Sequence, residues 1–307
     1  MNSLKPRFTI GRLIGALGLV LSLLLPATLH AGGDRSHGEG RLWRVDKPGA
    51  APSHVFGTMH TSDPQVVDLP TEVRQAFEGS ERLVLELVLT SEAGMELAQA
   101  MVMTDGRTLP DVIGDERFAK VLEGARRYGL PATQMQIFRP WAVMTFFSLP
   151  PAELKREIAG KLPLDQMLQT EAKAAGTPVH GLESATEQIS VFTELPEADQ
   201  IALLDVALIL NPSIDRLFEE MKQAYLAGDL NRLHEMSQEQ SAGTDPRLAE
   251  LFEDRLIGHR NQIMVERMQE YLTAGGAFVA VGALHLSGDD GILSLLEDQG
   301  YTVERVL

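Results

Sequence analysis

A Gly-x-x-His motif occurs twice in this chain, 225 residues apart. Residues 55–60 read Val-Phe-Gly-Thr-Met-His, and residues 281–285 read Val-Gly-Ala-Leu-His. Each motif follows an apolar run, so we expect two neighbouring buried strands that bring His60 and His285 to one pocket. Two imidazoles at one point can bind a divalent metal ion or transfer protons during catalysis.

Two glutamates are placed in a similar way. Glu86 lies in the apolar run 82–87, and Glu183 closes the run that begins at 177. In α/β proteins, groups at the carboxyl ends of buried strands line the functional crevice. Two imidazoles with one or two carboxylates form a ligand set for zinc, manganese, iron or cobalt.

Each of these residues also has a purely structural interpretation. A single Gly-x-x-His is a weak pattern, and most such histidines are structural. Glu86 also fits a strand with one face in solvent. Glu183 also fits a helix cap or a partner of Gln188 or Arg260. Their joint occurrence favours function, because burying such groups costs several kcal/mol unless they are paired or bind a metal.

Arg260 and Asn261 form a polar pair in an otherwise amphipathic helical stretch, 248–273. The structural interpretation is a surface salt bridge to Glu266 or Asp254. The functional one is an arginine that binds a substrate carboxylate or stabilises an oxyanion, with Asn261 as hydrogen-bond donor. We interpret the remaining histidines of the globular part as structural or exposed: His54, His180, His234 and His259.

Apolar strands and amphipathic helices alternate along the chain and must position these groups. Strands are predicted at 42–45, 54–57, 82–87, 177–181, 277–282 and 301–307. Helices are predicted at 71–78, 92–103, 116–128, 140–149, 163–175, 185–235 with a break at 211–212, 248–273 and 292–299. The pattern predicts an α/β fold: a central mixed sheet with flanking helices and large helical insertions, in one domain over 41–307.

Composition excludes several classes of function. The net charge is −16 with no basic patch, so neither nucleic acid nor an anionic membrane is an expected partner. The chain has no cysteine, so any metal site must use His, Asp or Glu. Neither Gly-x-Ser-x-Gly nor His-Glu-x-x-His occurs, which argues against a nucleophile-elbow serine hydrolase and a zincin.

The amino terminus is typical of an export signal. Residues 1–31 carry three basic residues and no acid, and the apolar run 13–25 is short for a membrane span of about 20 residues. We predict cleavage after Ala31, with an uncleaved anchor as the alternative. Residues 32–40 are predicted to be a disordered leader. The mature protein is then expected to be periplasmic or secreted, without stable membrane insertion.

Taken in order, these motifs resemble the TraB/GumN family. The resemblance runs from about residue 42 to 307 and rests on 56–60, 85–87, 139–141, 181–183 with 187–188, 260–261 and 281–286 with Gly288 and Gly291. That family includes the animal Tiki proteins, which are metal-dependent proteases that act on Wnt proteins. The resemblance implies a fold related to erythromycin-esterase-like and ChaN-like proteins.

The resemblance also implies a metal-dependent site built from the paired Gly-x-x-His motifs and a glutamate. The metal ligands that carry over are His60, His285 and Glu86. The residues that match further positions of the family pattern, as catalytic candidates beside Glu86, are Glu183, Arg260 and Asn261.

We therefore predict an exported metal-dependent hydrolase, a peptidase, that binds manganese, cobalt or zinc and acts on a peptide or protein. The alternative is a non-catalytic periplasmic binding protein that sequesters a peptide or another exported ligand and needs no metal. A structural envelope protein, the third hypothesis, would leave the two histidines far apart.

Overall fold

The structure is a computed structural model that describes residues 35–241, 245–247 and 254–307. The predicted signal peptide and its cleavage point lie outside these residues. Within them, no helix is long and apolar enough to cross a membrane.

A six-stranded mixed sheet lies at the centre of the fold, in the order β4-β3-β5-β2-β1-β6. The strands are β1 (Leu42–Asp46), β2 (Ser53–Thr58), β3 (Arg82–Leu87), β4 (Val179–Glu183), β5 (Ala277–Gly282) and β6 (Thr302–Arg305). Strands β4, β3, β5 and β2 are parallel, whereas β1 is antiparallel to both β2 and β6. The predicted α/β class with a mixed sheet is confirmed.

The two strands that precede the Gly-x-x-His motifs are neighbours, as the sequence predicts. β2 pairs with β5 in parallel, with Thr58 opposite Gly282, so both motifs leave the sheet at the same edge. Gly57 is needed for this arrangement, because a Cβ there would lie 2.8 Å from Leu286 Cδ1. The chain that carries His285 therefore packs directly against the end of β2.

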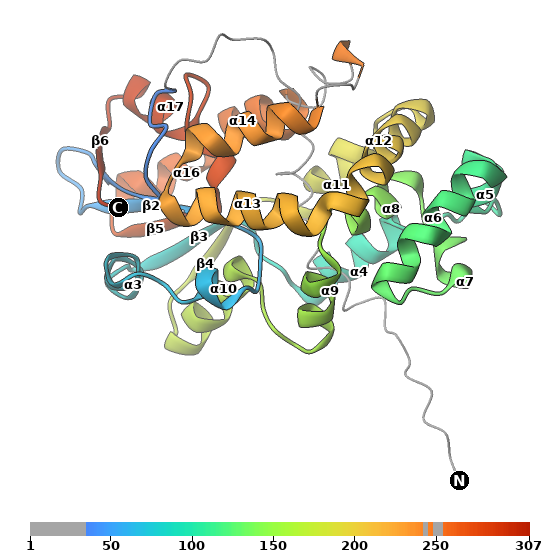
Figure 1. The fold of residues 1–307 in the computed structure, drawn as a ribbon. Coiled ribbons are helices and arrows are strands. Elements are labelled where there is room, and N and C mark those ends of the chain that lie inside the picture. The colour runs from blue at the N-terminus through green and yellow to red at the C-terminus, as the bar shows by residue number, and fades with distance from the viewer. Residues whose placement is uncertain (1–34, 242–244, 248–253) are drawn as a thin grey trace.

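Helices cover both faces of the sheet and extend beyond its strand ends. In the view of Figure 1, α14, α16 and α17 lie above the sheet and α3 and α10 below it, while α4 to α9, α11 and α12 gather on the right. The helices of the first half are α2 (Pro64–Val67), α3 (Thr71–Glu78), α4 (Ser91–Ala100), α5 (Leu109–Ile113), α6 (Asp115–Tyr128), α7 (Ala132–Met135), α8 (Pro140–Phe147), α9 (Pro151–Ile158) and α10 (Leu164–Ala175).

The second half continues in the same manner. It comprises α11 (Ala185–Thr193), α12 (Glu197–Leu210), the 3₁₀ turn η3 (Asn211–Ser213), α13 (Ile214–Ala227), α14 (Leu230–Ser241), the π turn η4 (Asp254–Gly258), α16 (His259–Ala274), the 3₁₀ turn η5 (Ala283–His285) and α17 (Ile292–Asp298). The predicted break at 211–212 is the turn η3.

The helical insertion shares the hydrophobic core of the sheet. Every residue of α8 is buried, and Trp141 stacks on Phe192 of α11 with ring centroids 5.3 Å apart. Phe138 and Phe146 meet edge to face at 5.0 Å. These contacts bury most of α8, so this helix is part of the hydrophobic core.

Residues 35–40, which belong to the predicted leader 32–40, contact the helices, and the leader as a whole stays a prediction. The backbone N–H of Arg35 donates to Asn231 Oδ1 at 3.0 Å, and the N–H of Gly40 donates to the carbonyl of Gly228 at 2.7 Å. The segment therefore lies against α14. The assignment of 41–307 as one domain stays a prediction.

Candidate functional site

Arg260, at the start of α16, lies at the centre of a buried charge network. Its Nε donates to Glu183 Oε1 at 2.7 Å, and its Nη2 donates to Glu183 Oε2 at 2.5 Å and Glu86 Oε2 at 2.8 Å. Burial alone would lower the pKa of the guanidinium, but the two carboxylates outweigh it and the pKa is raised. Arg260 therefore stays charged and joins α16 to the ends of β3 and β4.

Glu86 lies near the end of β3 and links the arginine to the second Gly-x-x-His motif. Its Oε1 accepts from the backbone N–H of Gly282 at 2.5 Å and lies 3.7 Å from His285 Nε2. The side chain is 17% exposed, against 3% for Glu183. Glu86 is thus the carboxylate of this pair that solvent or a substrate can reach.

Glu183, the last residue of β4, accepts hydrogen bonds on both of its carboxylate oxygens. Besides the two bonds from Arg260, its Oε2 accepts from Gln188 Nε2 at 3.1 Å. Both pairings considered from the sequence, with Gln188 and with Arg260, are present. The N-cap of α11 is Ser184, which forms a capping box with Glu187.

His285 is held in one tautomer by Asn261. The Asn261 amide donates through Nδ2 to the carbonyl of Asp290 at 2.8 Å, so its Oδ1 faces His285 Nδ1, 2.6 Å away. His285 must therefore donate through Nδ1–H, which leaves the lone pair on Nε2. Burial and then the charge of Arg260 lower the pKa of His285 to about 3, so the imidazole is neutral at pH 7.

His60 belongs to a neighbouring set of contacts. It follows β2 by two residues, and its Nδ1 lies 3.2 Å from Asp165 Oδ2 on α10. Asp165 also accepts from Thr58 Oγ1 at 2.7 Å. The six candidates from the sequence thus fall into two sets at one edge of the sheet: a connected network of Glu86, Glu183, Arg260, Asn261 and His285, and His60 with Asp165.

The donor chemistry fits a divalent ion at the imidazoles. Both histidines face an oxygen acceptor with Nδ1, so each carries its lone pair on Nε2, as metal-binding imidazoles do. Glu86 is already bonded to Arg260 and Gly282, so an ion ligated by this carboxylate would replace the arginine contact. As they stand, no three His, Asp or Glu side chains of the described residues converge to hold an ion.

Three residues near the site were not predicted from the sequence. Asp165 gave no signal, because an acid in the first turn of a helix is ordinary. His234 on α14 was interpreted as structural. It is buried, and that burial, with Arg35 and His285 nearby, lowers its pKa to about 3. Glu157 on α9 is the third, and its Oε2 is buried without a hydrogen-bond partner among the described residues.

Glu157→Gln is expected to raise the free energy of unfolding at pH 8 by about 3 kcal/mol at most. Burial raises the pKa of Glu157 from 4.5 to about 7, and the charge of the nearby Glu153 adds to this shift. The carboxyl of the unfolded chain ionises at lower pH than that of the folded protein. The contribution of Glu157 to the free energy of unfolding is therefore most favourable below pH 4.5 and is lost as the pH rises through 7.

Denaturant unfolding with chelator, from pH 4.5 to 8, should show that the stabilities of the wild type and Glu157→Gln converge in acid. The exposed Glu123→Gln serves as control, and a pH-independent difference would contradict the prediction.

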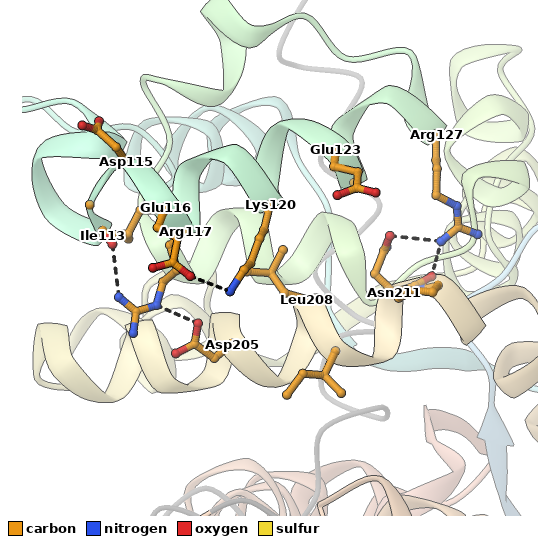
Figure 2. Close-up of a pocket in the computed structure, with 14 residues that line it drawn as sticks. Ile113, Asp115, Glu116, Arg117, Lys120, Glu123, Arg127, Asp205, Leu208 and Asn211 are labelled. Carbon is orange, nitrogen blue, oxygen red and sulfur yellow. Dashed lines mark hydrogen bonds and ion pairs between the residues drawn. The ribbon is translucent and has the colours of Figure 1, made fainter.

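A separate pocket lies between α6 and α12 (Figure 2). It has a volume of about 1130 Å³ and contains none of the predicted site residues. Its three cations are all paired: Arg117 Nε with Asp205 at 2.7 Å, Lys120 Nζ with Glu116 at 3.2 Å, and Arg127 Nη2 with Asp215 at 2.6 Å. We therefore place the candidate site at the strand ends.

Comparison with known proteins decides the family. The sequence model of the TraB/PrgY/gumN family matches residues 41–305. The chain belongs to this family. The resemblance inferred from the ordered motifs is thereby confirmed.

Relatives similar to this chain include proteins named as metalloproteases. The metalloprotease TIKI2 of Danio rerio is 24% identical over 314 residues, covering 86% of this chain and 60% of the relative. The metalloprotease TIKI1 of Homo sapiens is 25% identical, with 86% and 61% covered. The chain thus spans about 60% of the length of these metalloproteases.

A bacterial member matches over more of its length. The uncharacterized protein YbaP of Shigella flexneri is 24% identical over 253 residues, covering 82% of this chain and 90% of the relative. No solved structure matches this chain significantly.

Proposed function

We propose that this protein is an exported, metal-dependent hydrolase that cleaves peptide bonds. The observation that carries the proposal is the neutral His285, whose Nε2 lone pair lies beside Glu86 and Arg260 at the carboxyl ends of parallel strands. The named metalloproteases among the relatives support the reaction class. The signal-like residues 1–31 support export.

The exposure and charge of each side chain suggest a different catalytic role for it. His60 and His285 would hold the ion through Nε2, and at His285 the ion would replace the contact with Arg260 Nη1. When bound, a divalent ion polarises the scissile carbonyl and lowers the pKa of water. Glu86 is the better proton acceptor, because Glu183 is nearly inaccessible and saturated with donors.

Arg260 supplies a fixed positive charge beside the reacting groups. Its Nη1 lies 3.3 Å from His285 Nε2, so negative charge that develops on a carbonyl oxygen at this point is stabilised without reorganisation. Glu183 positions the guanidinium through its two hydrogen bonds. Asn261 keeps His285 in the required tautomer.

Digestion of a peptide library tests the proposal. Protein purified without chelator is assayed with manganese, cobalt or zinc, and its metal content is measured. We expect one ion to support cleavage, and His285→Ala to lower the rate at least about 100-fold, because it removes an ion ligand. His259→Ala, which removes the exposed histidine that begins α16, should retain the rate.

Two outcomes would contradict this proposal. A metal-free protein that binds peptides, ignores chelator and cleaves nothing would be the sequestering protein considered from the sequence. A folded His60→Ala variant with full metal content would refute the assignment of His60 as a ligand.

A further inference from the structure

The loop that carries His60 is fixed from two helices. Glu153 of α9, 2% exposed, accepts from Thr61 Oγ1 at 2.8 Å and from the backbone N–H of Ser62 at 3.3 Å. The N–H of Leu164, the first residue of α10, donates to the carbonyl of Thr61 at 3.1 Å. The backbone on the far side of His60 is therefore held in place without help from the imidazole.

Asp165 contacts both ends of the short segment between β2 and this loop. Its Oδ1 accepts from the buried hydroxyl of Thr58 at 2.7 Å, and its Oδ2 lies 3.2 Å from His60 Nδ1. The hydroxyl donor fixes the rotation of the carboxylate, so Oδ2 faces the imidazole. An ionised carboxylate only accepts hydrogen bonds, so Nδ1 of His60 must carry the proton.

We infer that Asp165 is a positioning residue of the active site, and that with Thr58 it holds His60 in the tautomer with the lone pair on Nε2. The functional consequence of this tautomer rests on the proposed function, because an ion ligand or a base requires the lone pair on Nε2. It matches the arrangement of Asn261 and His285 across the site, where a neutral amide oxygen takes the place of the carboxylate.

Asp165→Asn provides a test with almost unchanged shape. Thr58 continues to donate to the amide oxygen, so the amide nitrogen turns toward His60 Nδ1. That nitrogen donates, so Nδ1 must become an acceptor and the proton moves to Nε2. We expect metal affinity to fall about 10–100-fold, as for other groups that orient a ligand histidine.

The tautomer is read directly by long-range ¹H–¹⁵N correlation spectra of the histidine rings, recorded with chelator. The signal of His60 is identified by its loss in His60→Gln. The wild type should show Nδ1–H, and Asp165→Asn should show Nε2–H. Thr58→Val alone should leave the wild-type tautomer, because the carboxylate still accepts. Thr58→Val with Asp165→Asn frees the amide to rotate and should restore Nδ1–H at least in part.

The outcomes separate this inference from the proposed function. Nε2–H in the neutral imidazole of the wild type, or an unchanged metal affinity in a folded Asp165→Asn, would overturn the positioning role. The wild-type tautomer decides the question even if the variant does not fold. Expected tautomers in a protein that neither binds metal nor cleaves peptides would support the positioning role and contradict the proposed function.

Discussion

Arg260→Met is expected to lower the free energy of unfolding by about 3–5 kcal/mol, because it leaves two carboxylates without their cation. Glu183 has 3% of its side chain exposed and Glu86 has 17%, so water cannot replace the guanidinium at both. Methionine fills a similar volume, so the loss reports charge rather than a cavity. Denaturant unfolding at pH 7 measures the effect.

Arg267→Met is the matched control, since Arg267 lies on the same helix and pairs with Glu187 at 2.6 Å on the outside. That side chain is 42% exposed, so a loss of about 0–1 kcal/mol is expected. Adding Glu183→Gln and Glu86→Gln to Arg260→Met should recover much of the stability. A loss below 1 kcal/mol for Arg260→Met would show that the carboxylates are not buried as the structure has them.

Glu86→Gln should lower the rate of peptide cleavage by about 10²–10⁴-fold, the usual loss when a general base is removed. The amide keeps the shape and can still accept from the Gly282 N–H, so the protein should remain folded. Arg260 retains Glu183 as its partner. Rates are measured with saturating metal, so that proton transfer is separated from metal affinity.

Glu187→Gln is the control for this experiment, because Glu187 is also a carboxylate paired with an arginine of α16. Glu187 lies in the first turn of α11 with 43% of its side chain exposed, and its variant should keep the cleavage rate within about twofold, as expected for a residue outside the site. Equal losses in the two variants would point to a general effect of charge on α16 and would remove Glu86 from the role of base.

The local pattern of the sequence was sufficient to predict the strands that carry the candidate site residues. The predicted bounds of β3 and β5 agree with the structure, since both are continuous apolar runs flanked by Gly or polar turns. The prediction that the runs before His60 and His285 are neighbours is confirmed by the pairing of β2 with β5. β4 begins two residues later than predicted, which makes Glu183 its last residue.

The partners of these side chains were decided by tertiary structure. The sequence left Arg260 between a surface salt bridge and a functional role, and only packing placed it between Glu86 and Glu183. It gave no reason to join His60 to Asp165, because 105 positions separate them and an acid in the first turn of a helix has an ordinary local explanation.

The sequence by itself therefore determined which residues end buried strands, because hydrophobic periodicity and glycine positions are local properties of the chain. Tertiary structure alone decided their charge and tautomer. Those depend on burial and on donors from distant segments, such as Arg260 to Glu86 across 174 positions, and no local pattern encodes that distance.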